Sequence, residues 1–174
     1  CGAELVVPSE DQRRDPQRLL ALIRGQAVSH AFLPPALLSI LPLDQQLGLS
    51  HLITGGDVCE PAVITQLAGQ CRLHNIYGPT ESSVLATTRV FKAGDNPRNL
   101  GRPIANTQVL ILDEDLQPVA EQQPGELYID GPGVGLGYLN NTALSDERFV
   151  QLTLADGKHR RLYRTGDIGK WTPD

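Results

Sequence analysis

The chain has 174 residues, enough for one domain with a real core, and its 40% hydrophobic and 20% charged residues are typical of a globular protein. The formal net charge is −5, and its even spread along the chain excludes a basic face for nucleic acid and an acidic tail. No apolar run approaches the roughly 18 residues of a membrane span, and the 3 cysteines without a CxxC spacing are typical of free thiols in a reducing, cytoplasmic compartment.

In the first half of the chain, stretches typical of strands alternate with stretches typical of helices. Strands are expected at residues 2–7, 28–33, 51–54 and 73–76, and helices at residues 15–24, 36–41 and 60–67. Gly55 and Gly56 stop the third strand. Alternation of this kind predicts an α/β fold with a mainly parallel sheet.

After Glu81 the pattern changes to strands joined by turns, with little helix. Strands are expected at residues 83–91, 107–112, 125–129 and 161–164, with a loop at residues 113–115. We therefore expect residues 1–91 to form the later part of a mainly parallel α/β sheet layer, and residues 92–174 to form a β-rich, barrel-like subdomain.

The segment at residues 75–81, with the sequence NIYGPTE, combines groups that suit a nucleotide at the end of a strand, where open α/β sheets bind ligands. Tyr77 offers a flat face for a purine, and Gly78 with the following proline makes a tight turn. Thr80 offers a hydroxyl that can donate to a phosphate oxygen. Glu81 offers a hard oxygen ligand for Mg²⁺. Taken alone, the segment is better explained as an ordinary turn before the next strand.

The glycine-rich stretch at residues 131–137 suggests a dinucleotide-binding loop, but its spacing is wrong. A GxGxxG motif starting at Gly131 would need glycine at Leu136, and one starting at Gly133 would need it at Tyr138. The sequence also contains no P-loop lysine motif, no HExxH and no GxSxG. Dinucleotide-binding, P-loop, zinc-protease and serine-hydrolase interpretations are therefore rejected.

Three further motifs follow the first one in order: LGRPIANT at residues 100–107, GELYIDGPGVGLGYL at residues 125–139 and YRTGD at residues 163–167. In their order and approximate spacing, the four motifs resemble those of the adenylation domains of nonribosomal peptide synthetases. That superfamily also contains acyl-CoA synthetases and luciferases. The resemblance covers essentially the whole chain, which departs from it at Asp57, where glutamate is usual, and at Gly135-Leu136, where alanine-arginine is usual.

The resemblance implies roles for individual residues in binding ATP and Mg²⁺. Asn75 and Tyr77 match positions that face adenine, Thr80 matches a phosphate contact, and Glu81 matches the residue associated with magnesium. Asp167 matches the aspartate that holds the ribose, although such an aspartate can also simply cap a turn. The implied ATP-binding residues are Gly56, Asn75, Tyr77, Gly78, Thr80 and Asp167, and the implied catalytic residues are Thr80 and Glu81.

The resemblance also implies a pocket for the side chain of the substrate. Its lining positions match Phe32, Ile53, Gly55, Ile76, Val84 and Leu85, which are all apolar or glycine. Such a pocket disfavours a polar side chain, because a buried polar group would be left unpaired. An aliphatic amino acid is therefore expected as substrate, with the alternative that these six are ordinary strand and core residues.

The activity that the resemblance implies is ATP-dependent activation of an amino acid to aminoacyl-AMP in secondary metabolite biosynthesis. The acyl group then passes to the phosphopantetheine of a carrier (thiolation) domain, with a condensation domain as a further partner in the same assembly line. The alternatives are another adenylate-forming acyl- or aryl-CoA ligase, and a degenerate module without activity.

The ends of the sequence are typical of an excerpt from the large N-terminal subdomain of the family. The chain contains no methionine, and its Thr-Gly-Asp motif lies just before the position of the family's hinge. The family's triphosphate-clamping loop and mobile C-terminal subdomain have no counterpart in the sequence. We therefore expect the chain to be inactive by itself.

Overall fold

The computed structural model describes residues 2–153 and 157–173. It consists of two compact units, the first formed by residues 1–76 and 88–101 and the second by residues 77–87 and 102–174. The domain boundary expected after residue 91 stays a prediction. None of the helices in the described residues is long and apolar enough to cross a membrane.

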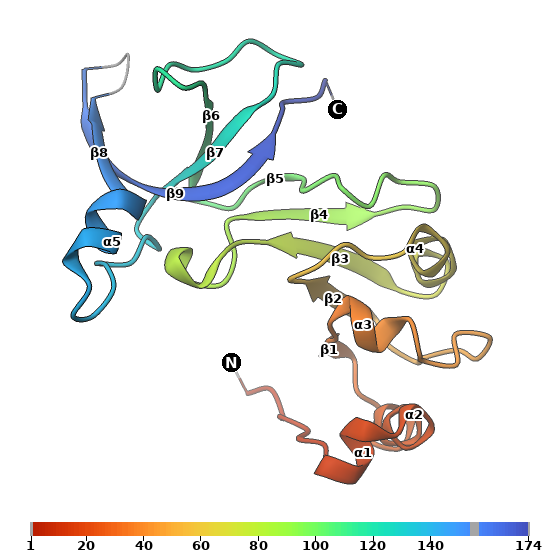
Figure 1. Ribbon diagram of the computed structural model, residues 1–174. Helices are drawn as coiled ribbons and strands as arrows, with labels where there is room; N and C mark the ends of the chain where they lie inside the picture. Colours follow the sequence, from red (N-terminus) through yellow and green to blue (C-terminus); the bar gives the residue numbers. More distant parts are fainter. Residues whose placement is uncertain (1, 154–156, 174) are drawn as a thin grey trace. The chain divides into compact units, whose positions relative to one another are not determined.

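The first unit is built on a sheet with the strand order β1-β2-β3-β4 (Figure 1). Its strands are β1 (His30–Phe32), β2 (His51–Gly55), β3 (Arg72–Tyr77) and β4 (Thr87–Phe91), of which the last residue of β3 and the first of β4 belong to the second unit. The first three strands are parallel, and their register places Ala31, Leu52 and Leu73 side by side. β4 runs antiparallel to β3 (Figure 1).

The helices of the first unit begin where the sequence supplies a cap or a proline. They are α1 (Glu10–Arg14), α2 (Pro16–Gly25), α3 (Pro35–Leu38) and α4 (Pro61–Ala68). Asp15 caps α2, because its side chain accepts hydrogen bonds from the backbone N–H groups of Gln17 and Arg18 at 2.9 and 3.2 Å. Proline at the first helical position starts α2, α3 and α4.

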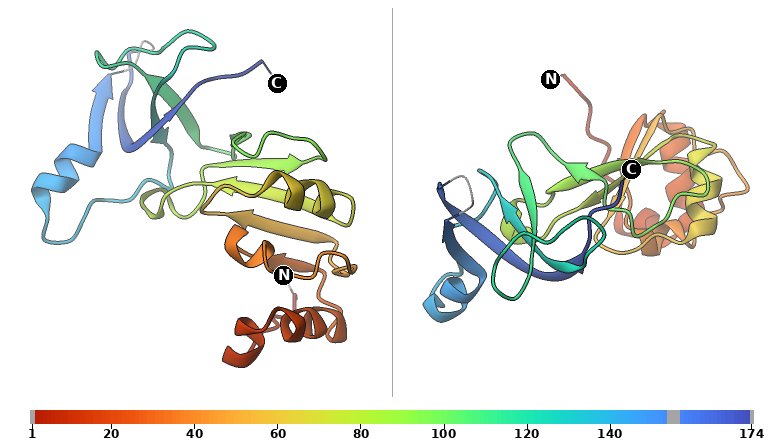
Figure 2. Two further views of the ribbon diagram at one scale, coloured as in Figure 1. Left: turned by 45° about the vertical axis from the view of Figure 1, so that its right-hand side comes forward. Right: turned by 90° about the horizontal axis from the view of Figure 1, so that it is seen from above.

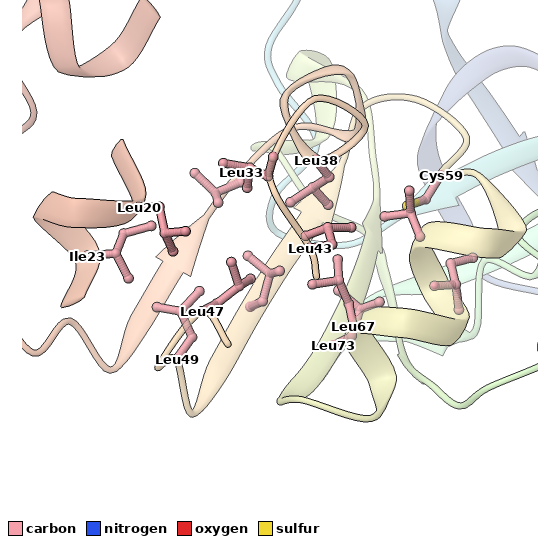
Figure 3. Packing of buried hydrophobic residues seen from close by; sticks show 14 of the residues in the cluster. Leu20, Ile23, Leu33, Leu38, Leu43, Leu47, Leu49, Cys59, Leu67 and Leu73 are labelled. Carbon is pink, nitrogen blue, oxygen red and sulfur yellow. The ribbon is translucent and has the colours of Figure 1, made fainter. Parts of the chain in front are cut away.

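One face of this sheet forms the hydrophobic core with the helices. Leu52 of β2 and Leu73 of β3 are fully buried there. They belong to one cluster with Leu20 of α2, Leu38 of α3 and Leu67 of α4 (Figure 3). Because side chains alternate along a strand, the neighbours of these leucines in sequence lie on the opposite face of the sheet.

The second unit contains an antiparallel sheet with the strand order β6-β7-β9-β8 (Figure 2). Its elements are η1 (Thr80–Ser82), β5 (Arg102–Pro103), β6 (Gln108–Leu112), β7 (Gly125–Asp130), α5 (Thr142–Arg148), β8 (Phe149–Thr153) and β9 (His159–Gly169). Leu112, Tyr128 and Leu162 form a buried cluster on the sheet. β9 is long and curved (Figure 1).

The α/β class is confirmed, but some expected elements are wrong. Residues 2–9 form neither strand nor helix, and Leu5 and Val7 are 85% and 74% exposed, so an apolar stretch alone does not make a strand without a neighbour to pair with. The strand expected from residue 83 begins only at Thr87. Ser83 and Val84 have φ angles of 60° and 77°, which a strand cannot adopt. α5 and β8 were not expected at all.

Candidate functional site

Tyr77, the last residue of β3, is joined to Asp167 of β9 within the second unit. The Tyr77 hydroxyl donates to Asp167 Oδ2 at 2.5 Å, although the two residues are 90 positions apart. Burial and then this hydrogen bond raise the pKa of Tyr77 well above its usual range, so the phenol keeps its proton at neutral pH. The structure thus brings together Tyr77 and Asp167, two of the residues predicted to contact the nucleotide, and the Asp167 side chain lies at an exposed position.

Asp167 lies in β9 and not in the tight turn expected from the sequence, and this part of β9 is anchored to β7. The Glu126 carboxylate accepts hydrogen bonds from the Gly166 backbone N–H at 3.1 Å and from Arg164 Nε at 2.9 Å. The Arg164 guanidinium is the main cause that holds the pKa of Glu126 below its usual range. Thr165 Oγ1 accepts from the Asp167 backbone N–H at 3.0 Å and donates to the carbonyl of Leu127 at 2.9 Å. The carboxylate of Asp167 is therefore carried by a fixed backbone.

The predicted nucleotide motif forms a closed turn, residues 77–86, here called the signature turn. The carbonyl of Tyr77 accepts a hydrogen bond from the backbone N–H of Ala86 at 2.7 Å, which closes the turn at its base. Gly78 has no space for a side chain, because a Cβ there would lie 2.6 Å from the backbone of both Leu85 and Ala86. Thr80 is exposed in this turn, so its hydroxyl can reach a ligand.

Glu81 lies in the signature turn with its carboxylate held by a phenol. The Tyr138 hydroxyl donates to Glu81 Oε1 at 2.6 Å. This bond is the largest cause that lowers the pKa of Glu81, with a smaller contribution from the Tyr163 hydroxyl. The carboxylate is therefore ionised at neutral pH and can act as a ligand for a hard cation.

The surroundings of Glu81 fit Mg²⁺ that arrives with a nucleotide. Within residues 2–153 and 157–173, no group of three His, Cys, Asp or Glu side chains could hold a metal ion. Magnesium is usually bound by one or two carboxylates together with substrate phosphates and water, and not by a cage made of protein alone. A single ionised carboxylate next to an exposed threonine hydroxyl is consistent with that mode of binding.

The glycine-rich loop, residues 131–139, packs on the signature turn. The Gly135 backbone N–H donates to the Glu81 carbonyl at 2.7 Å, and the Ser83 hydroxyl donates to the Gly133 carbonyl at 2.8 Å. Arg161 donates to the Gly135 carbonyl and to the next carbonyl along the loop. We expected this loop to scaffold a turn of the barrel, and the structure adds that it braces the segment that carries Glu81.

Sequence reasoning missed both Tyr138 and Arg161. Their contacts with Glu81 and with the glycine-rich loop join segments 57 and 26 positions apart. No spacing in the sequence links these residues. The only available signal was a tyrosine at the end of a glycine-rich run, which is not chemically distinctive.

Asn75, Gly55 and Gly56 are predicted site residues that lie in the first unit. Asn75 is 5% exposed, and its side-chain amide donates to the Asn99 carbonyl at 3.4 Å. A Cβ on Gly55 would lie 2.4 Å from the carbonyl oxygen of Ile76, so this glycine is required by the neighbouring strand. Gly56 has a φ of +87° and open space around it, so its backbone conformation favours glycine.

Four of the six predicted pocket residues share one face of the first-unit sheet. The register pairs Phe32 with Ile53 and Gly55 with Ile76, on the face opposite the core. Phe32 is 56% exposed. In the second unit, Val84 is 66% exposed and Leu85 is half-buried. Gly55 is the one buried residue among these six described residues, four of which lie in strands. The pocket and the alternative of ordinary strand and core residues both stay predictions.

Comparison with known proteins places the chain among enzymes of one family. The family model described as AMP-binding enzyme matches residues 1–139. The chain is 35% identical over 174 residues to bacitracin synthase 3 of Bacillus licheniformis, a match that covers 100% of this chain and 3% of the relative. It is 39% identical over 176 residues to novobiocin biosynthesis protein H of Streptomyces niveus, with 100% of this chain and 29% of the relative covered.

Solved structures agree with the sequence relatives. The nonribosomal peptide synthetase FmoA3 matches with a TM-score of 0.88 at 31% identity, covering 100% of this chain and 20% of that protein. PA1221, an NRPS protein containing adenylation and PCP domains, matches with a TM-score of 0.80 at 33% identity, covering 91% and 34%. The chain therefore spans about a third or less of the length of these relatives and structures.

Proposed function

The chain belongs to the family of AMP-binding enzymes, and on this basis we propose that it carries the nucleotide-binding residues of an adenylation domain that activates an amino acid. The observation that carries the proposal is the hydrogen bond between Tyr77 and Asp167, at 2.5 Å across 90 positions. An aromatic face and an exposed carboxylate side by side suit the base and the ribose of one nucleotide.

In the proposed site, Tyr77, Asp167 and Thr80 of the second unit each contact a different part of ATP. The Tyr77 ring stacks on the adenine, and the Asp167 carboxylate accepts hydrogen bonds from the ribose hydroxyls. The Thr80 hydroxyl donates to a phosphate oxygen. Gly78 shapes the turn that presents these groups. In the first unit, we propose that Asn75 contacts the adenine and that the open backbone of Gly56 lies beside the nucleotide.

We propose that Glu81 is the protein ligand of Mg²⁺. When bound, the ion neutralises charge on the phosphates during the transfer. The Tyr138 hydroxyl supports this role, because it keeps the carboxylate ionised through a 2.6 Å hydrogen bond. Thr80 and Glu81 contribute to the reaction by positioning the phosphates and their counter-ion.

The proposed reaction is a nucleotidyl transfer followed by formation of a thioester. A carboxylate oxygen of the amino acid attacks the α-phosphorus of ATP and the bond to pyrophosphate breaks, which gives aminoacyl-AMP. The sulfur of a phosphopantetheine thiol then attacks the acyl carbonyl, the thiol proton is lost and AMP leaves. The carrier domain is proposed by analogy with PA1221, an NRPS protein containing adenylation and PCP domains. A condensation domain and a cytoplasmic location are further proposals.

We propose an aliphatic amino acid as the substrate. The proposed pocket residues are Phe32, Ile53, Gly55, Ile76, Val84 and Leu85, none of which carries a polar side-chain atom. Exposed large apolar side chains such as Phe32 and Val84 support a role in ligand contact, because they contribute little to the core. Leucine, isoleucine, valine and alanine are the candidates.

The proposed function predicts pyrophosphate exchange that depends on an aliphatic amino acid in the full-length protein. Asp167→Ala is expected to raise the KM for ATP about 10- to 100-fold, because a hydrogen bond to a charged group contributes about 1.5–3 kcal/mol. The measurement is exchange of labelled pyrophosphate into ATP against a panel of amino, aryl and fatty acids. Asp115→Ala, in the loop after β6, serves as a control that changes a carboxylate away from the signature turn.

Each other outcome points to a different conclusion. Exchange driven only by aryl or fatty acids would move the protein to the acyl- or aryl-CoA ligases. Exchange driven by aspartate or lysine in preference to leucine would contradict the aliphatic pocket alone. A folded protein that exchanges with no acid would be the degenerate module, and the proposed function would be wrong.

A further inference from the structure

Contacts on two sides hold Tyr138 in place beside Glu81. The Tyr138 ring packs edge-on against Phe149, with the ring centroids 5.4 Å apart. The Tyr138 backbone N–H donates to Ser145 Oγ at 2.8 Å. Because the ring and the backbone are both held, the position of the hydroxyl that donates to Glu81 is fixed as well.

The loop that carries Tyr138 also holds the backbone of Glu81. The Gly135 N–H donates to the Glu81 carbonyl at 2.7 Å. Arg161 donates to the Gly135 carbonyl, and its guanidinium lies over the Phe149 ring at 4.7 Å from the centroid. The glycine-rich loop therefore fixes Glu81 twice, once at the main chain and once at the carboxylate.

This arrangement matters because the described side chains do not form a metal-binding cage around Glu81. No group of three metal-ligating side chains occurs in residues 2–153 and 157–173. An ion held by one carboxylate and by phosphates depends on the orientation of that carboxylate. Partners that orient a metal ligand typically change metal affinity or activity by about 10- to 100-fold.

We propose that Tyr138 is a positioning residue, whose hydroxyl sets the orientation in which the Glu81 carboxylate meets the metal–nucleotide complex. The inference rests on the proposed function, since it requires Glu81 to be a ligand of the ion. The interactions with the Tyr138 and Tyr163 hydroxyls leave the carboxylate able to bind a cation, because its two oxygens offer about four acceptor sites.

The test replaces Tyr138 by phenylalanine in the full-length protein, which keeps the ring and removes the hydroxyl. Mn²⁺ serves as the probe, and its binding in the presence of ATP is followed by electron paramagnetic resonance. The apparent affinity for Mn²⁺ is expected to fall about tenfold. Binding of AMP without metal, measured by calorimetry, is expected to stay unchanged, because the Tyr138 hydroxyl interacts with Glu81 and Tyr163 and not with the residues proposed to hold the base and the ribose.

Tyr128→Phe is the matched control. Its hydroxyl also points to a glutamate of the second unit, Glu126, at 3.5 Å, so the variant loses the same atom next to the same type of side chain. It is expected to bind Mn²⁺ like the parent. If Tyr138→Phe does not fold, Ser145→Ala provides a second route, since it removes the hydroxyl that accepts from the Tyr138 backbone, and Mn²⁺ affinity is expected to fall.

One double variant separates positioning from a general structural effect. In a Glu81→Gln background, Tyr138→Phe is expected to cause no further loss of Mn²⁺ affinity, because both changes act through one carboxylate. Additive losses would overturn the proposal, as would a Tyr138→Phe protein with unchanged Mn²⁺ binding. A folded parent protein that binds neither AMP nor Mn²⁺ with ATP would instead overturn the proposed function, and this inference with it.

Discussion

Gly78 lies where the backbone of the signature turn folds back on itself. A Cβ at this position would lie 2.6 Å from backbone atoms of both Leu85 and Ala86, which cannot move aside as a flexible side chain can. Gly78→Ala is therefore expected to lower the free energy of unfolding by about 1–3 kcal/mol. Urea unfolding of the full-length protein, followed by tyrosine fluorescence, measures the change.

Gly69→Ala is the control for this substitution. Gly69 follows α4 with a φ of −82°, and the nearest atom to a Cβ there is 3.6 Å away. The alanine variant is expected to be as stable as the parent, or more stable by up to about 1 kcal/mol through lower entropy of the unfolded chain. Equal stability of the two alanine variants would show that Gly78 is not constrained by its neighbours.

Some residues of the candidate site could be predicted from the sequence, and others could not. Tyr77 and Glu81 lie in one short motif with chemically distinct side chains, so the motif alone suggested them. Asp167 needed the resemblance, because an aspartate in a turn has several explanations. Tyr138 could not be predicted, because its importance comes from a contact across 57 positions that only the fold creates.

Three histidines form a row across the parallel strands of the first unit, on the face opposite the core. His30 of β1 stacks on His51 of β2 with ring centroids 4.5 Å apart, and His51 Nδ1 lies 2.9 Å from His74 Nε2 of β3. A hydrogen bond between two ring nitrogens needs one N–H and one lone pair. When both rings are protonated, neither has a lone pair left to accept the hydrogen bond, and two positive charges lie side by side.

This row predicts a loss of stability in mild acid. Burial and then the nearby charges of His51, Arg72 and His30 lower the pKa of His74. The unfolded chain therefore binds a proton more readily than the folded protein, and the free energy of unfolding decreases as the pH falls below about 6.5. Urea unfolding at pH values from 7.5 to 5 is expected to show this decrease.

His74→Gln removes the titrating ring and keeps a polar side chain on β3. The variant is expected to lose less stability between pH 7.5 and pH 5 than the parent. The comparison uses the change in the free energy of unfolding with pH. A difference in stability between the two proteins that is the same at every pH does not affect it. Identical slopes would contradict the role of His74.

Elements were predicted well where the sequence supplies local signals. α2 begins at Pro16 after a capping Asp15 and buries Leu19, Leu20 and Ile23, so cap and periodicity agree. α5 was missed, since none of its residues is buried and a surface helix this short has no apolar stripe to detect. Its one signal was the cap, because the Asn141 side chain accepts from the Leu144 backbone N–H at 3.2 Å.

For the whole chain, the first-unit sheet presents an edge at β1. In the part of the chain that the structure describes, β1 is the first strand of the order and pairs only with β2. Phe32 on this strand is 56% exposed. An edge strand with an exposed aromatic side chain is a site for association between copies.

The 174-residue chain by itself is therefore expected to self-associate at micromolar concentrations. Phe32→Lys is expected to shift it toward monomer, because a charge at an edge strand opposes pairing. Analytical ultracentrifugation measures the distribution. Val58→Lys, at a position 47% exposed outside the strands, is the control and is expected to associate like the parent. A monomeric parent chain would contradict the expectation.

The closed signature turn has a consequence for spacing. Tyr77 and Glu81 are joined by a backbone that is closed at its base by the bond from Ala86 and is held at Glu81 and Ser83 by the glycine-rich loop. The turn therefore fixes the distance between the aromatic ring of Tyr77 and the carboxylate of Glu81. One inserted residue could move these groups apart by up to about 3.5 Å, more than the length of a hydrogen bond. A turn of fixed length favours ligands in which the distance between an aromatic base and a charged group matches the distance between Tyr77 and Glu81.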